Sequence, residues 1–329
     1  MEKFSKEDYL IKKVVPFKPK EVTNINDLLK SLKFCGFQGK NLGIALDILE
    51  QMVTNTDCTT VLTLSGAMVP AGMGELISTL IDLKLIDVLV STGANIIHDL
   101  VDVFTEGGHY LGSSEVDDDD LFKHRINRIY DVFLPEDKYT VTERNILNIV
   151  HELYEEKRVH TTPSQFLKDL GLKIKKRCIV SLAAQRNIPI FVPAFSDSEL
   201  ALNLIKYSKR EGYDFQLDVL KDVELFADII QQSKLSGTFI IGGGTPRNWS
   251  QQVFPLLDQI STIEEMGYNF SVRIHTATEY DGGLSGCTVS ESKSWGKYAL
   301  ESKHISVWCD ATIAFPILVT GLLQRLKLN

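Results

Sequence analysis

The side chain in this sequence best suited to covalent chemistry is Lys297, which a tryptophan and a glycine precede. A neutral lysine amine forms Schiff bases with carbonyl carbons, and it stays neutral when it is desolvated or lies near another cation. Trp295 could supply an apolar wall beside Lys297 and could also hold a substrate cation over its ring. The residues alone leave open the alternative that Trp295 packs and Lys297 is solvated, since most lysines are surface residues.

The segment before Lys297 is a long polar loop. It follows a β-branched run at Phe270, Val272 and Ile274, and it is rich in small and acidic residues. A loop of this composition buries little apolar surface, so it is more typical of a functional segment than of a core. Cys287 within it is a candidate reactive thiol, although free cysteines more often pack as small apolar residues.

This loop resembles the signature of the deoxyhypusine synthase family. It reads Thr276-Ala277-Thr278-Glu279-Tyr280-Asp281-Gly282, then Ser285-Gly286, Glu291 and Ser294-Trp295-Gly296-Lys297. Other segments similar to the family follow in its order, at 36–38, 41–43, 88–93, 127–135, 162–164, 193–197, 242–244, 310–311 and 315–316. The resemblance covers nearly the whole chain after about residue 30.

The resemblance implies an NAD-dependent transfer. A polyamine carbon is oxidised, its four-carbon amine unit moves to Lys297 as a Schiff base, and the unit then passes to an acceptor amine and is reduced. Carried over by position, the NAD contacts are Thr92, Gly93, Asp197, Gly242, Gly243, Thr276, Ala277, Asp281, Ser285, Asp310 and Ala311. From the residues alone, the Gly-x-Gly-x-x-Gly fingerprint is absent, and three glycines after a strand suit either a phosphate or a tight turn.

Four residues are candidates for the amine site. Glu291 could hold a substrate ammonium by a charge-assisted hydrogen bond, and Trp295 could shape the slot. Asn248 aligns with a family histidine. His98 could move protons near neutral pH, and a hydrogen-bonded helix histidine is an equally good interpretation of it.

The departures from the family gather where the amine should bind. Family acids align with Leu202, Leu284 and Ile97, and the usual Asn and Ser of the cofactor site are replaced by Ala67 and Pro70. Each lost charged hydrogen bond would cost about 1.5 to 3 kcal/mol, so spermidine in the family's usual pose is expected to bind poorly. The residues that the resemblance implies for the reaction are therefore present, while several residues of the family's amine pocket are replaced.

Three functions remain in view. The first is transfer to a lysine of the hypusine-bearing translation factor, and the second is transfer to a small amine, as in homospermidine synthase. The third is a non-catalytic, NAD-binding partner of an active paralogue. Retention of Lys297, Trp295 and Glu291 disfavours the third, and the altered pocket favours the second mildly. By resemblance, we expect a homotetramer.

Composition sets the broad class. With 329 residues, 44% hydrophobic and 24% charged, the chain is typical of an ordinary globular protein. A net charge of -8 disfavours a nucleic-acid binder, and the five scattered cysteines suit a reducing compartment and indicate no metal site. The sequence shows neither a signal peptide nor an apolar run of about 18 residues, so we expect no membrane span and a cytoplasmic location.

The pattern of apolar runs predicts the elements that position these residues. Strands are expected at 60–64, 86–91, 188–192, 238–241 and 307–309, and helices at 42–52, 72–83, 95–103, 141–157, 163–170, 198–207, 219–232 and 313–326. Four aspartates at 117–120 suit a helix start near Leu121 better than a divalent metal. This alternation predicts an N-terminal arm over 1–25 and one doubly wound, Rossmann-like α/β domain over 26–329, with loops converging on a crevice at the strand ends.

Overall fold

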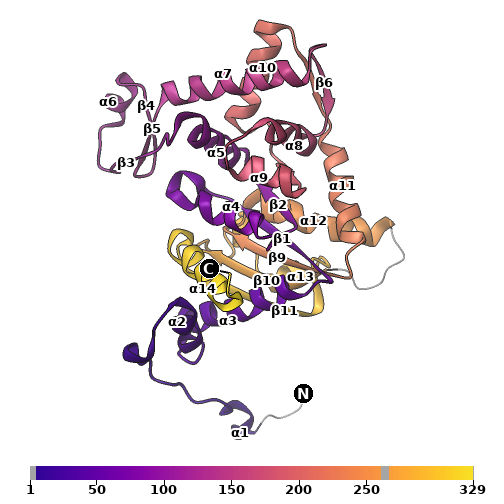
Figure 1. Cartoon of the computed structure of the whole chain (residues 1–329). Coiled ribbons are helices and arrows are strands. Elements are labelled where there is room, and N and C mark those ends of the chain that lie inside the picture. The colour runs from indigo at the N-terminus through magenta and orange to yellow at the C-terminus, as the bar shows by residue number, and fades with distance from the viewer. Residues whose placement is uncertain (1–4, 261–266, 329) are drawn as a thin grey trace.

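A six-stranded parallel sheet forms the centre of the computed structural model, which describes residues 5–260 and 267–328. The strand order is β11-β10-β9-β1-β2-β7 (Figure 1). The strands are β1 (Cys58–Leu64), β2 (Val88–Ser91), β7 (Ile190–Phe191), β9 (Leu235–Ile241), β10 (Tyr268–His275) and β11 (Tyr298–Trp308). Every pairing in this sheet is parallel, so the carboxyl ends of all its strands lie at one edge. The predicted doubly wound sheet is confirmed.

Helices cover both faces of the sheet, as a parallel sheet requires. Val61 and Val88 pack on one face against α11 (Val219–Gln231) and α12 (Gly244–Ile260). Their neighbours Leu62 and Leu89 point to the opposite face, whose core includes α3 (Phe37–Thr54), α4 (Gly74–Asp82), α5 (Gly93–Thr105) and α14 (Ala311–Leu326). This alternation of buried strand residues fixes the register of the sheet.

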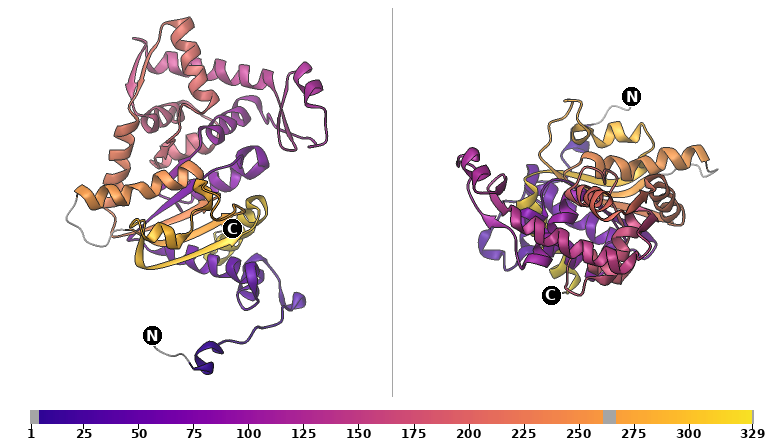
Figure 2. Two further views of the ribbon diagram at one scale, coloured as in Figure 1. Left: turned by 180° about the vertical axis from the view of Figure 1, so that it is seen from behind. Right: turned by 90° about the horizontal axis from the view of Figure 1, so that it is seen from above.

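A second group of elements lies at the end of the molecule away from α3 (Figures 1 and 2). It holds the helices α7 (Glu136–Leu153), α8 (Pro163–Lys173), α9 (Ile179–Arg186) and α10 (Glu199–Glu211), and a parallel strand pair, β6 (Arg158–Thr161) and β8 (Asp214–Leu217). A small antiparallel sheet, β3 (Tyr110–Leu111), β5 (Val132–Pro135) and β4 (Ile126–Ile129), adjoins it. The sequence pattern did not predict these five short strands, nor α9 and α12.

Several predicted bounds need correction. Cys309 lies outside β11, which begins at Tyr298 rather than at 307, and Ile188 and Val192 lie outside β7. Residues 72–73 belong to an irregular turn, Val69–Met73, in which Gly72 has a φ of 83°. The acidic helix start is confirmed, because the Asp117 carboxylate accepts a hydrogen bond from Asp119 N at the beginning of α6 (Asp118–Lys123).

The predicted N-terminal arm is extended and largely exposed over its described part, residues 5–24, while residues 1–4 lie outside the described chain. It contains α1 (Lys6–Tyr9) and η1 (Pro19–Glu21), and it projects away from the sheet (Figures 1 and 2). The chain joins the body at α2 (Ile25–Leu32), where Asn26 N donates to Gln324 Oε1 of α14 at 3.0 Å. None of the helices described is long and apolar enough to cross a membrane.

Two glycines of α3 test the packing of α2 against α3. A Cβ added at Gly43 would lie 2.5 Å from Leu29 O, whereas one at Gly39 would make an ordinary 3.4 Å contact with Leu32. We therefore expect Gly43→Ala to lower the free energy of unfolding by about 1 to 3 kcal/mol and Gly39→Ala to raise it by a few tenths. Urea denaturation measures both, and equal effects of the two substitutions would contradict this packing.

Candidate active site

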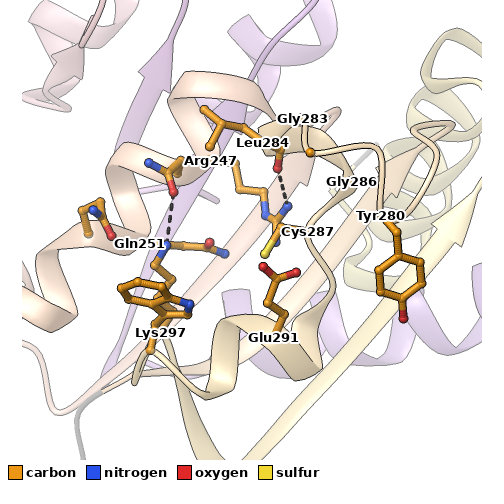
Figure 3. A pocket seen from close by; sticks show the side chains of 13 residues that line it. Arg247, Gln251, Tyr280, Gly283, Leu284, Gly286, Cys287, Glu291 and Lys297 are labelled. Atoms are coloured by element: carbon orange, nitrogen blue, oxygen red, sulfur yellow. Dashed lines mark hydrogen bonds between the residues drawn. The ribbon is translucent and has the colours of Figure 1, made fainter.

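A cavity of about 530 Å³ lies between α12 and the loop that follows β10 (Figure 3). This volume is within the usual range for small-molecule sites. Its lining residues are Arg247, Asn248, Gln251, Gln252, Tyr280, Gly282, Gly283, Leu284, Gly286, Cys287, Glu291, Trp295 and Lys297. Four residues predicted for catalysis and amine binding, namely Lys297, Trp295, Glu291 and Asn248, therefore share one cavity.

Lys297 is buried in this cavity, with 8% of its surface exposed. Its Nζ donates to Asn248 Oδ1 at 3.1 Å and lies 5.8 Å from the centre of the Trp295 ring. Burial lowers the pKa of Lys297 below that of an ordinary lysine, and the Arg247 charge lowers it too, while Cys287 and Glu291 act in the opposite direction. The alternative of a solvated Lys297 is wrong, and the environment shifts this amine toward its neutral form relative to an ordinary lysine.

The backbone around Lys297 is fixed from both sides. A short helix, α13 (Val289–Lys293), precedes it, and Lys297 N donates back to Ser292 O at 3.2 Å. Gly296 turns the chain with a φ of 69°, a conformation that favours glycine. Lys297 O then accepts from Tyr268 N at 3.1 Å, where β11 begins to pair with β10. The lysine thus enters the cavity from the junction between a loop and the sheet.

Arg273 ties the lysine loop to the sheet. It lies on β10 with only 3% of its surface exposed. Its Nε donates to Gly242 O at 3.0 Å and its Nη1 to Cys287 O at 3.1 Å, while Nη2 donates to Ser285 O. Burial, together with the charge of Arg247, lowers the pKa of Arg273 to about 10. One guanidinium therefore joins the glycine turn after β9 to two points of the loop.

Arg247 is a second buried cation, 2% exposed, on the first turn of α12. Its Nη1 donates to Leu284 O and its Nη2 to Ser292 Oγ, both at 3.2 Å, and its Nε has no partner (Figure 3). Neither Arg247 nor Arg273 forms an ion pair with a carboxylate of the described residues. Sequence reasoning missed both arginines, although each adjoins a recognised motif, the triple glycine for Arg247 and the loop for Arg273.

The predicted cofactor residues lie at the carboxyl edge of the sheet. They follow β2 (Thr92, Gly93), β7 (Asp197), β9 (Gly242, Gly243), β10 (Thr276, Ala277, Asp281, Ser285) and β11 (Asp310, Ala311). The sheet order turns at β1, whose neighbours β2 and β9 lead to opposite edges, and ligands of such sheets bind at this reversal. The predicted convergence of the loops is consistent with this topology.

The chemistry of this edge fits a dinucleotide. Asp281 and Asp310 are exposed carboxylates suited to ribose hydroxyls, and α5 and α12 begin here with helix N-termini suited to phosphate. Gly242 and Gly244 have φ values of 80° and 55°, so the chain turns tightly after β9. The Gly243 and Gly244 amides already donate within the protein, to Ser65 Oγ and Ser285 Oγ.

Near Ala67 and Pro70, which the resemblance predicts to replace polar residues of the cofactor site, the fully buried Asn95 connects two loops. Its Oδ1 accepts from Val69 N at 3.1 Å, and its Nδ2 donates to Gly66 O at 2.8 Å and Thr92 Oγ1 at 3.0 Å. Asn95 therefore fastens the turn after β1 to the turn after β2. These hydrogen bonds hold in place the turn after β1, which contains Ala67 and Pro70.

His98 lies outside the Lys297 cavity. Its Nδ1 is 2.9 Å from His109 Nε2, and His109 Nδ1 is 2.7 Å from Asp102 Oδ1. Burial, with the charge of His109, lowers the pKa of His98 to about 4, so His98 is neutral near pH 7. The hydrogen-bonded helix histidine describes what is seen, and a substrate role for His98 stays a prediction.

Comparison with known proteins assigns the chain to a class. The deoxyhypusine synthase family profile matches residues 27–322. A Methanosarcina mazei protein named "Probable deoxyhypusine synthase 2" is 36% identical over 309 residues, which cover 92% of this chain and 88% of that protein. An Archaeoglobus fulgidus protein of the same name is 38% identical over 291 residues, covering 88% of this chain and 94% of that one.

A solved structure shares the fold. A crystal structure described as that of "a putative deoxyhypusine synthase from Entamoeba histolytica" matches with a TM-score of 0.64 and 19% identity, over 94% of this chain and 97% of that one. The chain belongs to the deoxyhypusine synthase family, as the lysine loop predicted.

Replacing Asn248 by aspartate tests the charge state of Lys297. A carboxylate against Nζ favours the ammonium form, so the pKa of Lys297 should rise by about 1 unit or more. Competitive acetylation across a pH series, followed by mass spectrometry of the Lys297 peptide, should show half-maximal reactivity at higher pH in Asn248→Asp. Asn248→Ser, which adds no charge, is the control; the same shift in both variants would rule out the electrostatic cause.

Arg273→Lys tests the link between loop and sheet. A lysine keeps the charge but cannot reach all three carbonyls, so we expect the free energy of unfolding to fall by about 1 to 3 kcal/mol. Hydrogen exchange should speed up in residues 283–292 and stay unchanged in α8. The surface variant Arg177→Lys, whose partner Glu75 is exposed, should show neither effect. Unchanged exchange in the loop of Arg273→Lys would contradict the proposed link.

Proposed function

We propose that this protein transfers an aminobutyl-type group from a donor amine of the polyamine class to an acceptor amine, with Lys297 as the nucleophile. Family membership supports a transferase of this kind. The observation that carries the proposal is the buried Lys297 amine, hydrogen-bonded to Asn248 in a cavity of substrate size. A lysine in this setting is suited to form an imine.

The residues of the cavity have separate roles in this proposal. Lys297 Nζ attacks the donor carbon once it has been oxidised to an imine, and the bond from that carbon to the donor nitrogen breaks, so the rest of the donor leaves as a free amine. The lowered pKa of Lys297 keeps a share of its amine neutral for this step. Asn248 accepts a hydrogen bond from Nζ and so orients the amine. The Glu291 carboxylate, which points toward Cys287 in Figure 3, is available to a substrate ammonium. Trp295, with 63% of its surface exposed, forms one side of the cavity mouth.

The oxidation and reduction require a hydride carrier. NAD, held by the strand-end residues named above for the cofactor, would supply this hydride chemistry. The protein's own contribution is to position the donor carbon between that edge and Lys297. The loop joins these two regions, because Ser285 contacts the glycine turn while its neighbours Leu284 and Gly286 line the cavity.

The acceptor distinguishes two versions of the proposal. In one, it is a lysine of the hypusine-bearing translation factor; in the other, it is a small amine, as in homospermidine synthase. Leu284 in the cavity wall and Asn248 beside Lys297 replace family residues of the amine site, and this favours the small amine. We further propose a cytoplasmic homotetramer, which light scattering at micromolar concentration would test.

Imine trapping tests the proposed transfer. Purified protein with NAD and either spermidine, putrescine, homospermidine or agmatine is treated with borohydride, which reduces an imine to a stable amine. We expect an aminobutyl-sized mass increase on the Lys297 peptide with at least one donor, and none in Lys297→Arg. The matched control is Lys293→Arg, which alters an exposed lysine four residues away that donates to Leu300 O.

Two results would contradict the proposal. One is an adduct that persists in Lys297→Arg, because the nucleophile would then be another residue. The other is the absence of any adduct in protein that binds NAD, which would reject transfer from these four donors and leave an untested donor or the non-catalytic partner.

A further inference from the structure

The charges of the Lys297 cavity are unusual for a site that binds polyamines. Two basic side chains, Arg247 and Lys297, line it, and Arg273 lies buried behind the loop. Among the lining residues in the described part of the chain, Glu291 is the one carboxylate. A polyamine is cationic along its length, so a lining that holds the buried Arg247 charge and a single carboxylate, Glu291, is a poor match for it.

Arg247 has spare capacity for an anion. Its guanidinium is 98% buried, its Nε has no hydrogen-bond partner, and its other contacts are a carbonyl and a hydroxyl rather than a carboxylate. A buried cation without a counter-ion is costly, so an entering anion would relieve that cost. Arg247 also lies on the first turn of α12, where the helix dipole favours negative charge.

From these observations we propose that the amine that binds beside Lys297 also carries a carboxylate, which pairs with Arg247. The substrate class is then a diamino acid or a related amine of mixed charge, and its ammonium group faces Glu291. This inference rests on the proposed transfer to Lys297 and changes the class of its donor, from a simple polyamine to an amine that also carries a carboxylate.

A cofactor phosphate is another oxyanion that Arg247 could bind. The cavity argues for the substrate, because none of the predicted cofactor residues is among its described lining residues, while Lys297, Asn248 and Glu291 are. A substrate carboxylate and a cofactor phosphate can be distinguished, because substituting Arg247 should weaken the binding of a different ligand in each case. A substrate contact affects the affinity for the amine, and a phosphate contact affects the affinity for NAD.

Matched ligand pairs test the proposal by calorimetry on the full chain, with and without NAD. Ornithine is putrescine with one added carboxylate, and lysine is cadaverine with the same addition. We expect the carboxylate member of at least one pair to bind about 10-fold more tightly or better, as one charged hydrogen bond allows. Arg247→Gln should abolish this preference, and Arg247→Lys should keep part of it.

A second variant leaves Arg247 and its contacts in place. Leu284 is half exposed in the cavity wall, and its backbone carbonyl, which the substitution keeps, accepts the hydrogen bond from Arg247. Leu284→Asp adds a negative charge, so it should shift the preference toward putrescine or cadaverine. Leu284→Asn, similar in shape and neutral, should leave the preference near that of the wild type.

Each outcome bears on the proposal. It is overturned if the simple diamines bind as tightly as their carboxylate partners, if none of the four ligands binds, or if the preference survives in Arg247→Gln. Weaker NAD binding in Arg247→Gln with an unchanged ligand preference would assign Arg247 to the cofactor phosphate instead. Because these are binding measurements, a carboxylate preference without a Lys297 adduct would reject the transfer and retain the anion site.

Discussion

Two buried arginines hold the loop that carries Lys297, and the rest of the site depends on them. The large side chains of this loop, Tyr280, Leu284 and Trp295, are half or more exposed, so apolar burial cannot fix it. Hydrogen bonds from Arg273 and Arg247 to loop carbonyls fix it instead. Arg247 also brings positive charge close to the lysine, so this one side chain both holds the loop and lowers the pKa of Lys297.

The parallel sheet explains why the cofactor edge and the lysine cavity adjoin. Gly242 follows β9, and its carbonyl accepts from Arg273 of the neighbouring strand β10, while Gly244 of the same turn donates to Ser285 of the loop. The turn expected to meet a dinucleotide is therefore bonded directly to the loop that enters the cavity. Because Arg273 lies within a buried strand, its hydrogen bonds hold the loop in a fixed position relative to the sheet.

The sequence predicted the features whose signals are local. Buried parallel strands appear as apolar runs, as in β1 and β2, and the lysine loop has a distinctive order of residues, so the sheet and the family were both predictable. The short strands were not, because β6 and β8 each depend on a partner more than 50 residues away, as in the pairing of Arg158 with Asp214. Each strand has only four residues, so the alternation of polar and apolar residues in β8 is too short to identify a strand by itself.

The candidate site was predicted in part for a related reason. Residue type and family position identified Lys297, Glu291, Trp295 and Asn248, which the fold gathers in one cavity. Buried arginines run against the usual preference of that residue for the surface, so Arg247 and Arg273 gave no signal in composition or spacing. His98 was selected for its residue type and its position on a helix after a strand. Those two features do not reveal that His109 lies within hydrogen-bonding distance of it.

The charge state of the Lys297 amine is the central claim, and its pKa can be measured directly. Protein carrying ¹³C at lysine Cε, titrated by NMR, reports each ammonium group, and the resonance absent from Lys297→Arg identifies the one of interest. We predict that this resonance titrates below the ordinary lysine pKa of about 10.4, and that Arg247→Gln moves it upward. A Lys297 that titrates at or above the ordinary value, or that does not respond to Arg247→Gln, would contradict the account.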